Sequence, residues 1–126
     1  MILVVDDNAG NQYTARAVLE RFGYRAQLVS NGEEALDAYS KDNFDLILMD
    51  CRMPIMDGYE ATSAIRRAEE VTGDHVPIIG VTAYAFEGDR EKCLQAGMDD
   101  YVTKPLTLEA FKGMLDRWLP HNPPKN

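Results

Sequence analysis

The sequence predicts an α/β fold with a single doubly wound sheet of parallel strands and helices on both faces. Two observations lead to this prediction. Short apolar runs of strand length alternate along the chain with longer segments whose apolar residues recur at helical spacing. Several of these apolar runs also end directly in a polar residue, as buried strands do at the carboxyl edge of α/β sheets.

Composition limits the function classes. The chain has 126 residues, 45% of them hydrophobic, which fits one domain over residues 1–119 and a polar, proline-rich tail over residues 120–126. A net charge of −8 without a basic block argues against direct nucleic-acid binding. No apolar run approaches the roughly 18 residues of a membrane span, and no charged leader precedes the first strand, so we expect a cytoplasmic or cytoplasm-facing domain.

The first half of the chain is predicted to hold two strand–helix units and a third strand. The first strand covers residues 2–5, and Gly23 ends the helix after it. A half-covered strand at residues 26–28 is followed by Asn31 and Glu34, a pair typical of a capping box. The helix that they open ends near Asp42. The third strand, residues 46–50, ends in Asp50 and is expected to be buried on both faces.

The second half repeats this alternation. Asp57 and Glu60 form a second predicted capping box, and Gly73 ends that helix. The fourth strand covers residues 77–81 and ends at Thr82, and a charged helix over residues 86–95 follows, with Cys93 and Leu94 as its few apolar anchors, so we expect it to be loosely held. The fifth strand covers residues 101–103. Thr107 caps a last helix whose predicted apolar stripe is Leu108, Phe111, Leu115 and Trp118.

Five polar side chains follow directly after four of the predicted strands. They are Asp6, Asp7, Asp50, Thr82 and Lys104. Because the carboxyl ends of parallel strands meet at one edge of a sheet, these side chains are expected to converge there. Crowded carboxylates repel one another unless a cation is present, and hard oxygen ligands suit Mg²⁺. The sequence therefore predicts a magnesium site.

The same edge favours phosphoryl transfer. A carboxylate at a strand end, beside a metal and a lysine, is able to attack an activated phosphoryl donor and hold an aspartyl phosphate. In that chemistry Lys104 would pair with the phosphoryl oxygens and Thr82 would donate a hydrogen bond to one of them.

These residues resemble the receiver domain of two-component response regulators, from residue 2 to about residue 119. The matching motifs are Asp6-Asp7, Asp50 followed by Met53-Pro54 and Asp57-Gly58, Thr82-Ala83, and Lys104-Pro105. The resemblance implies a flavodoxin-like sheet of order 2-1-3-4-5. It also implies that Asp50 accepts phosphate from a histidine kinase or a histidine phosphotransfer protein.

Further expectations come from the resemblance alone. Asp6, Asp7, Asp50 and the backbone carbonyl of Arg52 match the family's magnesium ligands, and Lys104-Pro105 matches its usual cis peptide. A monomer, or a weak dimer formed on phosphorylation, is implied.

Tyr101 matches the family's aromatic switch position. We therefore expect that Thr82 moves toward a phosphorylated Asp50, that Tyr101 turns inward, and that the fourth helix shifts. The surface that reads out this change would include Tyr84, the fourth helix, Tyr101 and the start of the last helix.

Some segments resemble receivers of hybrid sensor histidine kinases more than receivers of transcription factors. They are Asp7-Asn8 with Asn11-Gln12, Met49-Asp50-Cys51, Tyr59-Glu60-Ala61-Thr62, and Asp89-Arg90-Glu91 through Gly97-Met98-Asp99-Asp100-Tyr101. Arg52 departs from the glutamine or methionine often found at its position. Its charged arm is expected beside the phosphoryl pocket, facing Tyr84, where it bears on phosphate lifetime and partner choice.

Three other functions remain open at this point. A magnesium-dependent phosphohydrolase normally carries an aspartate two residues after its nucleophile, where this chain has Arg52. A binding module that works without phosphorylation would not need the acidic pair, Asp50, Thr82 and Lys104. A flavodoxin-like cofactor protein would need a hydroxyl-rich phosphate loop after the first strand, which the sequence lacks.

Taken singly, several residues have simpler structural interpretations. Asp6 or Asp7 alone is typical of a helix cap, Thr82 alone of a turn, and Lys104 alone of a solvated surface. The remaining candidates are interpreted as structural: Cys51 and Cys93 as small, reduced core residues; Met49, Met53 and Met56 as packing residues; His75 and His121 as solvated surface; and Arg66 and Arg67 as an exposed helix face.

Overall fold

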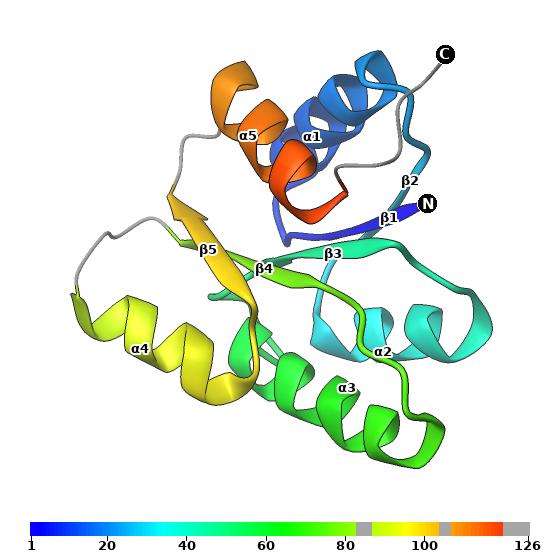
Figure 1. Ribbon diagram of the computed structural model, residues 1–126, viewed down its shortest axis with the longest axis vertical. Helices are drawn as coiled ribbons and strands as arrows, with labels where there is room; N and C mark the ends of the chain where they lie inside the picture. Colours follow the sequence, from blue (N-terminus) through cyan, green and yellow to red (C-terminus); the bar gives the residue numbers. More distant parts are fainter. Residues whose placement is uncertain (83–86, 104–106, 120–126) are drawn as a thin grey trace.

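The computed structural model describes residues 1–82, 87–103 and 107–119. For residues 87–90 it describes the backbone alone. Its sheet has five parallel strands in the order β2-β1-β3-β4-β5, which confirms the predicted fold class (Figure 1). The strands are β1 (Ile2–Val5), β2 (Ala26–Val29), β3 (Leu46–Asp50), β4 (Ile78–Thr82) and β5 (Asp100–Thr103). The helices are α1 (Ala9–Arg21), α2 (Gly32–Lys41), α3 (Gly58–Thr72), α4 (Glu87–Ala96) and α5 (Leu108–Trp118).

Helices cover both faces of the sheet. Helices α1 and α5 pack on one face, and α2, α3 and α4 on the other (Figure 1). Alternate residues of each inner strand therefore belong to two different cores: Ile47 and Met49 of β3 face α2 and α3, while Leu46 and Leu48 face α1 and α5. Every residue of β1, β3 and β4 is buried, which explains why these strands are continuous apolar runs in the sequence.

Both predicted capping pairs are present, but one of them makes a different hydrogen bond from the one predicted. Asp57 and Glu60 form the predicted reciprocal capping box at the start of α3. At the start of α2, Asn31 Oδ1 accepts from the Glu34 backbone N–H at 2.9 Å, as predicted. The Glu34 carboxylate, however, accepts from the N–H of Ser30 rather than from that of Asn31. The cap is therefore made from both residues but is not reciprocal.

Two predicted apolar anchors are wrong. Leu94 is 47% exposed although its neighbour Cys93 is fully buried, because successive helix residues point about 100° apart and only one of the two can face the sheet. Leu108 is 48% exposed because it lies in the first turn of α5, where Glu109 is exposed as well. Met114 is buried with Phe111 and Leu115. The buried side of α5 therefore begins at Phe111, about one turn after the predicted first residue, Leu108.

A charged network at the amino-terminal edge of the sheet corrects the interpretation of Arg66 as an exposed residue. Its side chain is only 17% exposed and pairs with Glu69 at 2.6 Å and with Asp99 at 2.8 Å. It also donates to the backbone carbonyls of Gly97 and Val76. The long guanidinium reaches from α3 to the α4–β5 connection, a contact that sequence spacing does not indicate.

Other residues complete this network. The buried Glu69 carboxylate also accepts from the Val76 N–H at 2.7 Å and from the Tyr39 hydroxyl at 3.2 Å. His75, interpreted as solvated surface, has an exposed ring, but its Nε2 also lies 2.7 Å from Asp99 Oδ1. We call Arg66, Glu69, His75 and Asp99 the Arg66 network.

Candidate functional site

Three carboxylates gather at the carboxyl edge of the sheet. Asp6 and Asp7 follow β1, and Asp50 is the last residue of β3, the strand that pairs with β1. One oxygen from each carboxylate lies within 4.8 Å of the others. Asp6 and Asp50 are buried, at 7% and 4% exposure, while Asp7 is exposed. The structure thus brings together the three acidic residues that the sequence predicted would converge.

Gln12 holds the acidic segment after β1 in place. Its buried amide group donates to the backbone carbonyl of Asp6 at 2.6 Å and to that of Val29 at 2.9 Å. The Asp6 carboxylate accepts from the N–H of Asn8, whose own side chain caps α1. The cap of α1 is therefore Asn8, and the simpler interpretation of Asp6 or Asp7 as the helix cap is wrong. The sequence placed Gln12 only in a segment that resembles hybrid-kinase receivers and indicated no role for it at the site, because a polar residue at a helix position buried against the sheet carries no distinctive local pattern.

The connection after β3 fixes the Asp50 carboxylate. Asp50 Oδ1 accepts from the N–H of Arg52 at 3.3 Å. Gly58, at the start of α3, approaches so closely that a Cβ there would lie 2.2 Å from the backbone oxygen of Asp50. The Gly58 N–H also donates to the carbonyl of Cys51. Only glycine allows this approach, so the Asp57-Gly58 motif positions the segment that carries Asp50.

Thr82 lies at the same edge. Asp50 is in register with Val81, so Thr82, the last residue of β4, lies beside the chain that leaves β3, and its side chain is 3% exposed. Tyr101 on β5 is half-buried and packs against the core that faces α2, α3 and α4. Lys104, Pro105, Tyr84, His121 and the tail lie outside the described residues, so the predictions made for them stay predictions.

The two cysteines lie beneath the site. Both are buried and reduced, as predicted, and their Sγ atoms are 3.8 Å apart. The hydrogen bond with Cys93 and burial raise the pKa of the Cys51 thiol, so this sulfur stays a protonated packing atom. A Cβ at Gly80 would lie 3.3 Å from Cys51 Sγ and 2.5 Å from the sulfur of Met98. The absence of a side chain at Gly80 makes room for these three sulfurs.

The acidic cluster fits a hard divalent cation. Carboxylate oxygens are the ligands that Mg²⁺ prefers, and it usually takes one or two carboxylates and keeps waters that a phosphate oxygen is able to replace. Bringing three negative charges together inside 4.8 Å is unfavourable without such a cation. Geometry and donor chemistry therefore agree on a site for a divalent cation.

The family model of the response regulator receiver domain matches residues 2–116. The chain belongs to this receiver family. Its fold and its acidic edge are those that the sequence resemblance implied.

The known proteins that this chain resembles include histidine kinases, and the chain matches one part of each. The chain is 46% identical over 110 residues to hybrid signal transduction histidine kinase I of Dictyostelium discoideum, which covers 83% of this chain and 6% of that kinase. It is 41% identical over 118 residues to sensor histidine kinase GacS of Pseudomonas protegens, which covers 93% of this chain and 13% of that kinase. This receiver sequence therefore spans a small part of the relatives it matches.

Two solved receiver domains have the same fold. The receiver of sensor histidine kinase PA1611 from Pseudomonas aeruginosa, which holds a magnesium ion in its active site cleft, is 48% identical with a TM-score of 0.85, covering 94% of this chain and 96% of that one. The receiver of Saccharomyces cerevisiae Ssk1, in a co-crystal with the histidine phosphotransfer protein Ypd1, is 32% identical with a TM-score of 0.88, covering 93% and 86%. None of the described helices of this receiver has the length and apolar character needed to cross a membrane.

Proposed function

We propose that this receiver is a phosphoacceptor of a two-component phosphorelay and that Asp50 takes the phosphoryl group. The observation that carries the proposal is the convergence of Asp6, Asp7 and Asp50 within 4.8 Å at the carboxyl edge of the sheet. Asp50 is the acceptor among the three because it ends the central strand β3 and is held by the close approach of Gly58. Asp6 and Asp7 lie on the connection between β1 and α1, and in this proposal they serve as cation ligands.

In the transfer step, one carboxylate oxygen of Asp50 attacks the phosphorus of a phosphohistidine. A phosphorus–oxygen bond forms while the phosphorus–nitrogen bond breaks, and the electron pair leaves with the ring nitrogen, which takes up a proton. The N–H of Arg52, 3.3 Å from Asp50 Oδ1, keeps the carboxylate oriented for this attack. Thr82 and Lys104 would contact the phosphoryl oxygens once they are attached.

Asp6, Asp7, Asp50 and the backbone carbonyl of Arg52 would hold Mg²⁺. The bound ion supplies charge neutralisation for the phosphoryl oxygens. Support for this ligand set comes from the hard oxygen donors of the three carboxylates and from the magnesium ion in the PA1611 receiver. The exposed Asp7 carboxylate leaves that side of the site open to a donor.

A histidine phosphotransfer protein or a histidine kinase would dock over this edge. Two large apolar side chains near it are exposed: Tyr13, in the second turn of α1, at 58%, and Ile55, in the connection after β3, at 73%. Ile55 also has a positive φ of 71°, a backbone conformation that a β-branched residue rarely adopts. Exposed apolar residues beside a reactive group are typical of an interaction surface. The Ypd1 complex of a similar receiver supports this class of partner.

Phosphorylation would be read out on the face made by α4, β5 and α5. Thr82 moves toward the phosphoryl group, and Tyr101 turns into the space that it leaves. The half-burial of Tyr101 and the small apolar side of α4, on which Cys93 is buried while Leu94 is exposed, support a shift of this helix. We further propose that residues 1–119 form the domain, that it works in the cytoplasm as part of a hybrid sensor kinase, and that it is a monomer or a weak phosphorylation-dependent dimer.

Incubation with phosphoramidate and Mg²⁺, followed by intact-mass measurement, tests the acceptor. The wild type is expected to gain one phosphoryl group, and Asp50→Asn none. Asp37→Asn is the matched control, because Asp37 is exposed on α2 and, among the residues that the structure describes, its carboxylate pairs with Lys41 alone. A gain in Asp50→Asn would place the acceptor elsewhere. Sustained turnover of phosphatase substrates by the wild type would favour the phosphohydrolase instead.

Amide hydrogen exchange with and without a beryllofluoride mimic tests the switch. We expect changed protection in α4, β5 and the first turn of α5, and unchanged protection in α2. Identical protection in both states would rule out the switch while leaving the acceptor proposal intact.

A further inference from the structure

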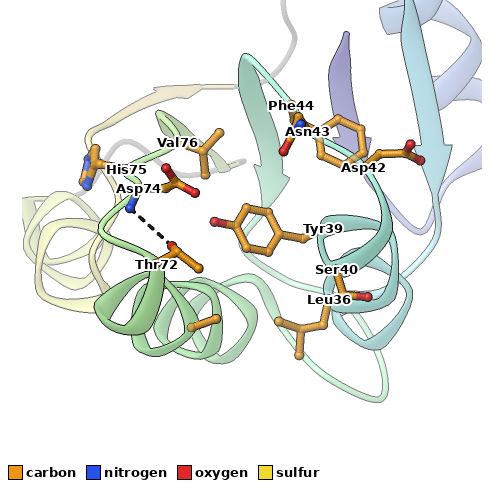
Figure 2. A pocket seen from close by; sticks show the side chains of 11 residues that line it. Leu36, Tyr39, Ser40, Asp42, Asn43, Phe44, Thr72, Asp74, His75 and Val76 are labelled. Atoms are coloured by element: carbon orange, nitrogen blue, oxygen red, sulfur yellow. Dashed lines mark hydrogen bonds between the residues drawn. The ribbon is translucent and has the colours of Figure 1, made fainter.

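A cavity of about 550 Å³ lies between α2 and α3, at the end of the sheet opposite the acidic cluster (Figure 2). Its volume is within the range of small-molecule sites. Helix α2 contributes Leu36, Tyr39 and Ser40, the connection to β3 contributes residues 42–44, and the remaining walls are Ala68 and Thr72 of α3 with residues 74–76. Phe44 and Val76 precede β3 and β4, so the cavity opens at the amino-terminal edge, far from Asp50.

The walls combine flat apolar surface with a carboxylate. The rings of Tyr39 and Phe44 face the cavity, together with Leu36 and Val76 (Figure 2). The Tyr39 hydroxyl and the Asp74 carboxylate point toward each other across it (Figure 2). Burial, followed by the charge of Glu69 and with a smaller part from Asp74, raises the pKa of Tyr39 to about 12, so its hydroxyl is neutral at physiological pH.

The side chains that line the cavity carry negative charge. Asp42 and Asp74 line it, and neither carboxylate has an ion-pair partner among the residues that the structure describes. The lining includes neither lysine nor arginine. Its one histidine, His75, is bound to Asp99 of the Arg66 network, and its ring points away from the cavity (Figure 2). The local potential therefore favours a cation.

We propose that this cavity, which we call the α2–α3 pocket, binds a small organic cation with a primary ammonium group on a flat apolar body. The ammonium group pairs with the Asp74 carboxylate at the hydroxyl end of Tyr39, whose oxygen accepts a hydrogen bond from it. The apolar body packs against Phe44, Leu36 and Val76. Charge complementarity and the aromatic walls together select this chemistry over an anion or a purely apolar ligand.

Two-dimensional amide NMR titrations of the full chain test the pocket with three probes. Phenethylamine carries both the ammonium group and the flat body, 3-phenylpropionate carries the body with a negative charge, and ethylammonium carries the charge with almost no body. We expect saturable shifts at residues 39–44 and 72–76 with phenethylamine alone. Equal saturation by 3-phenylpropionate or by ethylammonium would overturn the proposal, as would the absence of shifts with phenethylamine.

Matched variants locate the ammonium group. Asp74→Asn, at an exposed side chain outside every described ion pair, is expected to raise the Kd of phenethylamine about two- to fivefold. Asp37→Asn, on the same helix as Tyr39 but outside the lining, should leave this Kd unchanged. An unchanged Kd in Asp74→Asn would overturn the assignment. Tenfold tighter binding of N-acetylarginine methylamide would overturn the small amine in favour of a protein side chain as the occupant.

The pocket does not rest on the phosphoacceptor proposal. Asp50→Asn is expected to bind phenethylamine with the wild-type Kd, because Asp50 lies at the opposite end of β3 from Phe44. Failure of phosphorylation and failure of amine binding are thus separately visible in one set of proteins.

Discussion

The two edges of the sheet carry charge in opposite arrangements. At the carboxyl edge, Asp50 is 4% exposed and lies with two other carboxylates, so like charges are gathered. At the amino-terminal edge, Glu69 is also 4% exposed, but Arg66 lies between it and Asp99, so opposite charges alternate. Equal burial therefore has different consequences. The alternating edge pairs its charges within the chain, while the like-charged edge is arranged for a cation that comes from outside the chain.

The largest expected effect is at the alternating edge. Arg66→Met should lower the free energy of unfolding by about 3–5 kcal/mol, because it leaves the buried Glu69 carboxylate without its cation. Arg67→Met, at the exposed neighbouring position, is the control and should change this free energy by no more than about 0.5 kcal/mol. Urea unfolding measures both. Equal effects of the two variants would contradict the contrast between the edges.

Magnesium should stabilise through the other edge. At a Mg²⁺ concentration one hundred times its Kd, the free energy of unfolding should rise by about 2.7 kcal/mol, because the folded state alone offers the gathered carboxylates. Arg66→Met should show the same increment, and Asp50→Asn a much smaller one at equal Mg²⁺. Urea unfolding with Mg²⁺, and with EDTA in its place, measures it. A full increment in Asp50→Asn would place the ion elsewhere.

Removing one like charge should have a smaller effect of the opposite sign in the absence of metal. Asp7→Asn is expected to raise the free energy of unfolding in EDTA by up to about 1 kcal/mol, because repulsion within the cluster falls. The same substitution should weaken Mg²⁺ binding, which isothermal titration measures. Destabilisation of the metal-free variant would mean that Asp7 works as a structural residue.

A pH dependence is expected beside the Arg66 network. Burial and the neighbouring Glu69 raise the pKa of Tyr39 from 10.0 to about 12, so the folded chain keeps this proton at pH values where the unfolded chain loses it. The resulting stability is fully present below pH 10 and falls as the pH rises toward about 12. Tyr39→Phe should flatten the decline of the urea midpoint over this window. Parallel pH profiles of the two proteins would contradict the coupling.

Much of the fold was readable from the sequence because burial on both faces leaves a local pattern. The apolar runs that became β1, β3 and β4, the Asp57 cap and the alternation of strands and helices all depend on neighbours along the chain. The gathering of Asp6, Asp7 and Asp50 followed from one rule of parallel sheets, that carboxyl ends of strands share an edge.

The tertiary structure alone decided which charged and apolar side chains are covered. Arg66 and Arg67 are adjacent arginines on one helix, yet the first reaches Asp99 across 33 residues of chain and the second is solvated. Leu94 was predicted to be an anchor and is exposed, while Gln12, to which the sequence gave no role, is buried against two strand ends. Residue type and spacing limit which contacts a side chain can make. Which of these contacts a long side chain forms is decided only when the helices pack on the sheet.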